Sequence, residues 1–442
     1  MVEFGLDSLV INSDTYAEAR KAGRDLWVDA RTRYTMILLS PEELMTRQFA
    51  QLLEQKEFSG RVCMLGIDEI HLLHWWGKSF RPAFRQIANL RARLPKIRGH
   101  QLPVVAVTAT LRVGATMDEV TRILGISPGR YHLIRRSNMR YDIQIIFQQL
   151  KSGLTSHSFP ELDWILDEGD NTVIFCKTIS LGFHVAAYLW RQAKARNMSR
   201  IERRIRLFNS LNWASYNSET LGFLNNNQES SITIATDTLS VGWDSKYTQN
   251  AVLLGETDDV DEFVQKIGRI GRNHQAVSHP RAFLYYTHSA MAKAQLVMEQ
   301  YHEGGGHRAV PKGKTDSDMD LSMARLLTAL CIHDELDLLF DNPAEDPVCL
   351  CRRCIGNPPV QRLLMCNCSG QACAPEIMQE SSAVVRQVAS GKTRARRGET
   401  MSKEIRAHGT SQLGKFRWAV FRAPMMENMD CYPHKPSSQT TQ

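Results

Sequence analysis

Short apolar runs alternate with helical, amphipathic stretches through the first 300 residues. In the first 140 residues the runs are SLVIN (8–12), YTMILLS (34–40), RVCMLGI (61–67) and PVVAVTA (103–109). Between residues 141 and 300 they are NTVIFC (171–176), SITIAT (231–236), NAVLLG (250–255) and RAFLYYT (281–287). Runs of this length and composition are typical of buried strands. The alternation predicts an α/β fold of two consecutive units, each a parallel sheet covered by helices, with ligands at the carboxyl ends of the strands.

The pattern changes after residue 300. Gly304-Gly305-Gly306 and the polar stretch up to Asp320 indicate a linker, and the segment 321–340 has the pattern of a helix that leads into a cysteine cluster. From residue 376 the chain is rich in Ser, Arg and Thr, with eleven Lys/Arg against six Asp/Glu. We therefore expect α/β units at 1–140 and 141–320, a helical Cys-rich subdomain at 321–375, and a basic, disordered tail at 376–442.

Composition narrows the class of protein. With 442 residues, 43% hydrophobic and 23% charged, the chain is not collagen, coiled coil, a disulfide mini-protein or wholly disordered. It has no apolar run of about 18 residues and no basic-then-apolar signal at its start, so we expect no membrane span and no secretion. A net charge of +7 suits a nucleic-acid partner without proving one. We expect the ten cysteines to be thiols or metal ligands.

An acidic pair directly follows the run at 61–67, in the sequence Asp68-Glu69-Ile70-His71. A nucleotide hydrolase uses one such carboxylate to hold Mg²⁺ and the next to polarise the attacking water. Acidic residues also favour a helix N-terminus, so alone the motif leaves both interpretations open. Upstream, Ser40 before Pro-Glu-Glu has the pattern of a helix N-cap with a capping box.

Aromatic and basic residues follow the acidic pair, in Trp75-Trp76-Gly77-Lys78-Ser79-Phe80-Arg81. Exposed aromatics beside Lys and Arg are typical of a platform on which single-stranded bases stack. A corner of the hydrophobic core is the alternative. Thr108 and Thr110 stand at the end of the run 103–109, where hydroxyls could couple nucleotide to polynucleotide.

The second unit carries a comparable set of residues. Thr236 ends the run 231–236 and is followed by Gly242 and Asp244; the segment Gln265-Lys266-Ile267-Gly268-Arg269-Ile270-Gly271-Arg272 comes about twenty residues later. Arginines three apart lie on one face of a helix and could reach a phosphate across a cleft. A solvated basic face is the other interpretation.

Taken together, these segments resemble the superfamily 2 helicases and, within them, the RecQ-like DNA helicases. The matching segments, in the family's order and spacing from about residue 5 to 355, are SPEEL (40–44), DEIH (68–71), HWWGKSFRP (74–82), TAT (108–110), SNMRYDI (137–143), VIFCKT (173–178), ATDTLSVGWD (235–244) and QKIGRIGR (265–272). The resemblance implies two RecA-like motor domains that bind ATP and Mg²⁺ and unwind DNA from 3′ to 5′. Single-stranded DNA and duplex DNA with a 3′ tail are the expected partners, and the nucleus is the expected location if the source is a eukaryote.

The resemblance also implies roles for single residues. Asp68 would act on Mg²⁺, Glu69 would be the catalytic base and His71 would couple the two domains. Nucleotide sensing and the arginine finger would fall to Gln265, Arg269 and Arg272, with Arg272 favoured as the finger. Gly242 and Asp244 would line the facing cleft wall, and Trp76, Phe80 and Arg81 match the aromatic-rich loop of RecQ relatives. The expected nucleic-acid contacts are Ser40, Trp75, Trp76, Lys78, Phe80, Arg81, Thr108, Thr110 and Thr236.

RecQ relatives carry a four-Cys zinc site after the second motor domain. The matching positions here are Cys331, Cys349, Cys351 and Cys354, which would hold a structural Zn²⁺. The CxC spacing departs from the usual CxxC. Cys366, Cys368 and Cys373 could instead complete the site or form a second one, and buried free thiols are the third interpretation.

A motor of this kind needs a phosphate-binding GxxxxGK[ST] loop. The only GK[ST] is Gly313-Lys314-Thr315, where Arg308 takes the place of the first glycine and no apolar strand precedes. In relatives the loop precedes the region matched by residues 5–15. We therefore expect that the sequence starts inside the first motor domain and that the chain alone hydrolyses ATP poorly. A non-catalytic nucleic-acid-binding module and an RNA-directed DExH motor remain alternatives; the aromatic loop and the cysteines argue against the RNA motor.

Overall fold

The computed structural model describes residues 5–73, 102–126, 129–225, 231–236, 245–303, 319–346 and 365–373, with residues 87, 90, 93, 94, 239 and 243 between them. All of them belong to the unit Met1–Ile377. We call residues 5–126 the first lobe, 143–303 the second lobe and 319–373 the helical unit. The predicted basic tail at 376–442 lies outside the described residues. None of the helices in the described ranges combines the length and hydropathy that a membrane crossing requires.

The first lobe alternates short strands with helices. Its elements are β1 (Ser8–Ile11), α1 (Ser13–Lys21), α2 (Leu26–Thr32), β2 (Met36–Leu39), the 3-10 helix η2 (Pro41–Met45), α3 (Arg47–Glu54), α4 (Lys56–Ser59), β3 (Leu65–Ile67), β4 (Val104–Ala106) and α7 (Ala115–Ile123). Asn12 caps α1 through a capping box with Thr15, and Asp25 caps α2. The polar residues that follow β1 therefore start the helix that covers it.

The strands of the first lobe form two separate parallel pairs in the described residues, β1 with β2 and β3 with β4. One face of these pairs is buried, because Leu9, Ile11 and Ile67 share a core with Trp27, Phe49 and residues from α7. The alternate side chains are exposed: Val10 by 41%, Leu38 by 40% and Val105 by 46%. Parallel strands are normally covered on both faces, so this lobe is unusual for its class.

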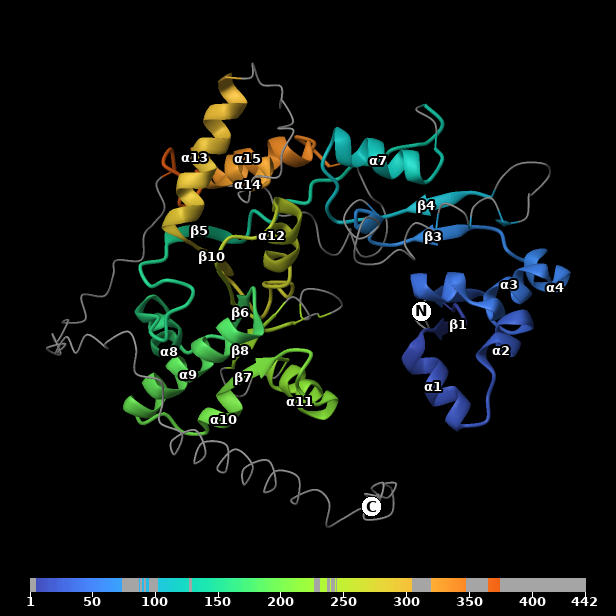
Figure 1. Cartoon of the computed structure of the whole chain (residues 1–442), viewed down its shortest axis with the longest axis horizontal. Helices are drawn as coiled ribbons and strands as arrows, with labels where there is room; N and C mark the ends of the chain where they lie inside the picture. Colours follow the sequence, from blue (N-terminus) through green and yellow to red (C-terminus); the bar gives the residue numbers. More distant parts are fainter. Residues whose placement is uncertain are drawn as a thin grey trace, which may run out of the picture. The chain divides into compact units, whose positions relative to one another are not determined.

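The second lobe contains one six-stranded parallel sheet in the order β5-β10-β9-β6-β8-β7 (Figure 1). Its elements are β5 (Gln144–Gln149), the 3-10 helix η4 (Pro160–Leu162), α8 (Trp164–Glu168), β6 (Thr172–Cys176), α9 (Ile179–Ala195), α10 (Ile201–Arg204), β7 (Ile205–Phe208), α11 (Ala214–Leu224), β8 (Ile232–Ala235), β9 (Asn250–Leu254), α12 (Val260–Ile267), β10 (Arg281–Tyr286) and α13 (His288–Glu303). Alternate residues of β6 enter two different cores, Phe175 one and Ile174 the other. Both faces of the sheet are thus packed.

The helical unit is packed onto the second lobe. Helices α14 (Leu321–Leu327) and α15 (Ile332–Phe340) contribute Met323, Leu336 and Phe340 to the core that also holds Ile145 of β5. In Figure 1 these helices lie with α13 beside β5 and β10. The segment 365–373 is bound to the edge strand β5, because the Ser369 N–H donates to the Ile145 carbonyl at 3.0 Å. The helical unit therefore covers the β5 edge of the sheet.

The predicted α/β class with parallel sheets is confirmed, and each of the eight apolar runs contains a strand. Two further strands, β5 and β7, were not predicted. Both lie at the edges of the sheet and carry polar residues, including the buried Arg206. One local prediction was wrong: Ser40 precedes a 3-10 helix and makes no capping bond, whereas Thr46 caps α3. The domain boundaries at 140 and 320 stay predictions.

Candidate active site and metal centre

The acidic pair lies at the carboxyl end of β3, where a parallel sheet binds its ligands. Asp68 is exposed, and its Oδ1 accepts the Glu69 N–H at 2.8 Å. Glu69 adopts a left-handed backbone, with φ of 50°, and is half-buried. A non-glycine residue in this conformation is uncommon and occurs at functional sites. The turn thus presents two carboxyl groups side by side.

The electrostatic environment suits proton transfer at Glu69. Burial raises the pKa of the Glu69 carboxyl, the charge of Asp68 raises it further, and the Arg269 guanidinium opposes both. A carboxylate whose pKa is raised toward neutrality is a better general base than an ordinary one. The influence of Arg269 is notable because this residue belongs to the second lobe.

His71 is buried and bonded at both ring nitrogens. Its Nδ1 lies 2.7 Å from the Thr108 hydroxyl, and its Nε2 lies 2.6 Å from Nε2 of Gln265. Burial lowers the pKa of His71 to about 4, so the ring is neutral at pH 7. The Thr108 hydroxyl donates its proton to the Thr110 carbonyl at 3.0 Å and must accept from His71. Nδ1 therefore carries the ring proton, and the bare Nε2 accepts from the Gln265 amide.

This chain of bonds joins three of the predicted motifs. Gln265 lies on α12 of the second lobe and also donates to the Thr110 hydroxyl at 3.2 Å. His71 follows β3, and Thr108 and Thr110 follow β4. A change in the position of α12 would therefore reach the ends of two strands of the first lobe directly.

The two arginines follow the end of α12. Nη1 of Arg269 donates to the Trp243 carbonyl at 3.0 Å, and Nε of the exposed Arg272 donates to the Gly268 carbonyl at 3.1 Å. Gly271 between them has φ of +61°, and a Cβ there would come within 2.7 Å of Pro280. Only glycine fits this turn.

Arg140 is a residue whose role the sequence did not suggest. Its Nη2 donates to the Gly271 carbonyl at 2.8 Å, and its Nε donates to Oδ1 of Asp142 at 2.8 Å. Arg140 thus fixes the turn that carries the two arginines. In the sequence, only the position of Arg140 within the helicase-like segment SNMRYDI indicated that this residue could have a role at the site.

A second residue that sequence reasoning missed is Arg112, two positions after Thr110. Its Nε donates to Asp261 of α12 at 2.7 Å, and its Nη1 donates to Asp320, the N-cap of α14, at 3.0 Å. The side chain is 13% exposed. Burial, followed by the charge of Asp261, raises the pKa of the neighbouring Asp259 to about 7. Arg112 therefore ties the first lobe to both α12 and the helical unit within an acidic surrounding.

The other predicted site residues divide into two groups. Thr236, at the end of β8, and Ser40, after β2, are described and half-buried. The other predicted site residues are not among those that the structure describes: Trp75, Trp76, Lys78, Phe80, Arg81, Gly242 and Asp244.

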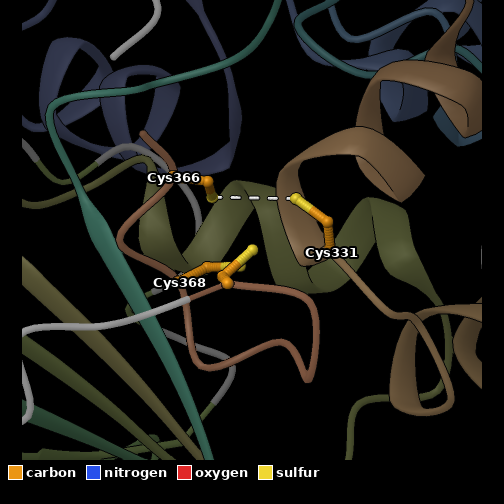
Figure 2. A group of neighbouring side chains, drawn as sticks. Cys331, Cys366 and Cys368 are labelled. Atoms are coloured by element: carbon orange, nitrogen blue, oxygen red, sulfur yellow. Dashed lines mark hydrogen bonds between the residues drawn. The ribbon is translucent and has the colours of Figure 1, made fainter. Parts of the chain in front are cut away.

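Four cysteine sulfurs converge between the start of α15 and the segment 365–373. Cys331, Cys366, Cys368 and Cys373 each offer a sulfur, and all four lie within 4.8 Å of one another. Cys331 precedes α15, and Figure 2 shows its side chain pointing toward Cys366, with the two sulfurs 3.7 Å apart. The sulfurs of Cys368 and Cys373 are 3.4 Å apart. Tetrahedral zinc with bonds of about 2.3 Å places its sulfurs about 3.8 Å apart, so the donor set fits this ion.

The surroundings disfavour the thiolate at Cys331 and Cys366 and favour it at Cys368. Burial raises the pKa of Cys331 to about 12 and also raises that of Cys366. Burial opposes ionisation of Cys368 too, but N–H donors from Gly370 and Ile332 lower the pKa of Cys368. A coordinating cation deprotonates its thiols, which removes the cost of charge in this buried place. Nδ1 of His333 lies 3.3 Å from the Cys366 sulfur as a further polar neighbour.

Gly370 allows the close approach that builds this centre. A Cβ at this position would lie 2.4 Å from the Leu330 carbonyl oxygen and 2.9 Å from Cα of Cys331. The Ala372 N–H donates to the same carbonyl at 2.9 Å. The backbone of the 365–373 segment therefore packs directly against the residue before Cys331.

The cysteine set differs from the one first expected. Among the described residues, the sulfurs beside that of Cys331 are those of the three cysteines considered as the alternative. The four sulfurs of Cys331, Cys366, Cys368 and Cys373 fill a tetrahedral set without a further ligand. Cys349, Cys351 and Cys354 lie outside the described residues.

Comparison with known proteins gives relatives of one kind. No protein-family model matches the chain. It is 26% identical over 176 residues to the ATP-dependent DNA helicase RecQ of Haemophilus influenzae, covering 39% of this chain and 25% of that protein. It is 43% identical over 75 residues to RecQ of Synechocystis, covering 17% of this chain and 15% of the relative. The probable ATP-dependent DNA helicase RecS of Bacillus subtilis is 32% identical over 114 residues, covering 25% and 21%.

Solved structures give distant likenesses. The helicase MrfA bound to DNA has a TM-score of 0.49 at 15% identity, over 68% of this chain and 41% of MrfA. The Mycobacterium smegmatis helicase Lhr, bound to single-stranded DNA and AMP-PNP, has a TM-score of 0.46 at 14% identity, over 68% and 37%.

The matched region spans a quarter or less of the length of the curated relatives. Those relatives are all named as ATP-dependent DNA helicases, of the RecQ, Q1 or RecS kind. Over part of its length, the chain is therefore similar in sequence to RecQ-like ATP-dependent DNA helicases.

Proposed function

We propose that this chain acts as the motor portion of an ATP-dependent 3′–5′ DNA helicase of the RecQ type. The observation that carries the proposal is the doubly bonded His71, with Thr108 on one ring nitrogen and Gln265 on the other. A motor must pass the state of its nucleotide to the strands that hold the nucleic acid. His71 is placed to do so, because it stands three residues from Asp68 and contacts both lobes.

In this proposal the carboxyl ends of the strands form the nucleotide side of the site. Asp68 would hold Mg²⁺, which supplies charge neutralisation to the phosphates of ATP. Glu69 accepts a proton from the attacking water, a task that its raised pKa favours. Arg269 acts on the charge of Glu69 from the second lobe, and Arg272 lies three residues further along the chain, beyond the turn at Gly271. Closure of the two lobes brings these groups together.

The four cysteines would hold a structural Zn²⁺. Cys331 directly precedes α15, while Cys366, Cys368 and Cys373 belong to the segment bound to β5. An ion at this place fixes α15 to the edge of the second-lobe sheet. Its role is structural, because four protein sulfurs leave no open position.

The sequence also predicts how fast the isolated chain hydrolyses ATP. It contains no GxxxxGK[ST] segment after an apolar strand. Without such a loop ATP has no main-chain cradle for its phosphates, so this 442-residue chain by itself hydrolyses ATP slowly. The same feature favours a second candidate, a nucleic-acid-binding module that is not catalytic on its own.

Binding and hydrolysis measured on the full 442-residue chain test the proposal. Fluorescence anisotropy compares a duplex with a 3′ single-stranded DNA tail, the same duplex with a 5′ tail, and the RNA equivalents, in a salt series from about 50 to 200 mM. We expect preference for DNA over RNA and for the 3′ tail, with turnover of ATP well below about 1 s⁻¹.

Glu69→Gln is the matched variant, because it keeps the size of the side chain and removes the base. It should bind DNA like the natural chain and lose any residual hydrolysis. Preference for RNA would contradict the assignment to DNA, and DNA-stimulated turnover above about 1 s⁻¹ would contradict the account of the phosphate cradle.

A further inference from the structure

We propose that the loop after β7, residues 209–213, is a binding site for single-stranded nucleic acid in which Trp213 stacks on a base. The inference rests on the proposed function, since it assumes that the chain binds a nucleic-acid strand. It adds a contact that neither the motifs nor the relatives' names assign.

The first observation is exposure of large apolar side chains. Trp213 is 64% exposed and Leu211 is 73% exposed, whereas Trp27 and Trp243 are 6% and 5% exposed. Tryptophan is usually well buried in folded proteins, and exposing its ring to water opposes folding. An indole displayed in this way is therefore suited to contact a ligand.

The second observation is that the loop is held firmly by asparagine side chains. The Asn209 carboxamide oxygen accepts the Leu211 N–H at 3.0 Å, and the Asn209 carbonyl accepts Nδ2 of Asn217 at 2.9 Å. Nδ2 of Asn212 donates to the Leu207 carbonyl at 2.8 Å. Asn209 is 1% exposed, so the support is internal while the apolar tips face outward. A loop fixed before binding loses little conformational entropy when the ligand arrives.

The third observation is the place of the loop in the sheet. Strands β6, β8 and β7 are neighbours and parallel, so their carboxyl ends meet at one edge. Lys177 follows β6, Thr236 follows β8, and the Trp213 loop follows β7. The Thr236 N–H donates to the Phe208 carbonyl at 3.3 Å, which joins two of these ends directly. Ligands of α/β sheets bind at this edge.

The residues at the carboxyl ends of these strands favour binding of a nucleic acid over binding of an apolar protein surface. The residues beside Trp213 and Leu211 are asparagines and a serine, and Lys177 has a side chain that is 56% exposed, although it is paired with Asp258. A protein-docking patch needs a contiguous apolar area, which polar neighbours interrupt. An aromatic ring amid amides, a hydroxyl and an amine matches the way single strands are bound, by stacking on bases with polar contacts to the backbone.

The stacking assignment makes a specific prediction about salt. Base stacking does not release counterions, whereas each phosphate contact adds about 0.7 to the slope of log K against log salt for a single strand. Loss of Trp213 should therefore weaken binding at every salt concentration by one factor, and leave the slope unchanged.

The experiment measures binding of the full chain to a fluorescent single-stranded DNA in a salt series, for the natural chain, Trp213→Ala and Trp213→Phe. We expect Trp213→Ala to weaken binding about 5- to 150-fold, equivalent to about 1–3 kcal/mol for one stacked base, and Trp213→Phe to retain most of the affinity. Leu296→Ala is the control, because Leu296 is a 50% exposed apolar residue of the same lobe on α13, which follows β10, and β10 is separated from β7 by three strands of the sheet. It should bind like the natural chain.

Two results would overturn the inference while leaving the proposed function intact. Unchanged DNA binding by Trp213→Ala would assign the exposed loop to a protein partner instead. A lower salt slope for Trp213→Ala would assign the loss to phosphate contacts. If the natural chain bound no DNA, the proposed function would fail, and the inference with it. Circular dichroism of each variant checks that the exposed substitutions leave the fold intact.

Discussion

The sheets of the two lobes differ in how completely they are covered. In the second lobe the five residues of β6 and the five of β9 are all buried, and the sheet continues over six strands. In the first lobe the described strands form two separate pairs, and Val10, Leu38 and Val105 present apolar side chains to solvent. Both lobes belong to the same α/β class, yet only the second packs its described strands on both faces.

This difference indicates where the first lobe obtains its order. Isolated pairs of parallel strands are marginally stable, because they bury little surface for each strand. The first lobe compensates through bonds to the second lobe, notably His71 to Gln265 and Arg112 to Asp261. We infer that the first lobe depends on these interlobe contacts, while the second lobe is stable through its own core and through any ion held at the candidate cysteine site.

The largest expected effect concerns the metal centre of the helical unit. Cys368→Ala removes one of four ligands, and structural zinc is worth about 10–16 kcal/mol in small zinc domains. We expect loss of bound zinc and strongly reduced hydrogen-exchange protection in α15 and β5, with little change in the first lobe. Cys63→Ala, at an exposed thiol of the first lobe, is the control. Full zinc content in Cys368→Ala would contradict the ligand assignment.

Substitutions of apolar residues should have the next largest effect, and their cost in unfolding free energy should differ between the two lobes. Phe263→Ala deletes a completely buried ring of the second lobe and should cost about 3–5 kcal/mol of unfolding free energy. Val105→Ala in the first lobe should cost less than about 1 kcal/mol, because Val105 is 46% exposed. Urea denaturation with a probe in each lobe measures both. A large loss for Val105→Ala would show that this strand face is covered in solution.

Breaking the ionic contact between the lobes should have the next largest effect. Arg112→Ala leaves Asp261 and Asp320 without their shared cation and should cost about 2–5 kcal/mol. Thermal melting compares it with Arg122→Ala, whose 74% exposed side chain pairs with Glu119 at 3.7 Å and should cost less than about 1 kcal/mol. Equal melting temperatures for the two variants would show that the ion pairs of Arg112 do not stabilise the contact between the lobes.

The pH dependence of the interlobe contact follows from His71. Its folded pKa of about 4 lies below the ordinary histidine value of 6.5, so the neutral ring stabilises the fold above pH 6.5 and this contribution is lost as pH falls toward 4. The effect is on the order of 3 kcal/mol at about 1.4 kcal/mol per pKa unit. His71→Gln cannot titrate and should flatten the slope between pH 4 and 6.5.

The comparison between His71→Gln and the natural chain is needed because Asp259 acts in the opposite direction. Its raised pKa of about 7 makes the fold more stable below pH 4 and less stable as pH rises toward 7. The difference between the two melting profiles isolates His71, because Asp259 is common to both. An unchanged profile would show that His71 is not buried in the neutral form.

The sequence predicted the fold better than it predicted the partners within the site. Apolar runs mark strands because burial dictates composition, so the edge strands β5, with three glutamines, and β7, interrupted by Arg206, were not predicted. The positions of Asp68, Glu69 and His71 at a strand end were predicted from the run before them. The partners of Arg112 are 149 and 208 residues away in the chain, and no local pattern indicates such pairings.

The cysteines illustrate the same limit. The resemblance to RecQ relatives favoured Cys349, Cys351 and Cys354 as partners of Cys331, although their CxC spacing departs from the usual CxxC. The observed partners are Cys366, Cys368 and Cys373, which depend on the hydrogen bonds of residues 367–369 to β5. Since β5 was not predicted from the sequence, the surface that selects these cysteines could not be predicted either.

The most direct test of the central claim is a double-mutant cycle between His71 and Gln265. The readout is hydrogen exchange at the Val107 amide, which bonds the Ile67 carbonyl at 2.9 Å within the first lobe. Comparing His71→Ala, Gln265→Ala and the double variant should give a coupling energy of about 0.5–3 kcal/mol, because both residues contribute to one contact that orders the first lobe. Additive effects, with a coupling energy near zero, would contradict the claim that the second lobe holds the first in place through His71.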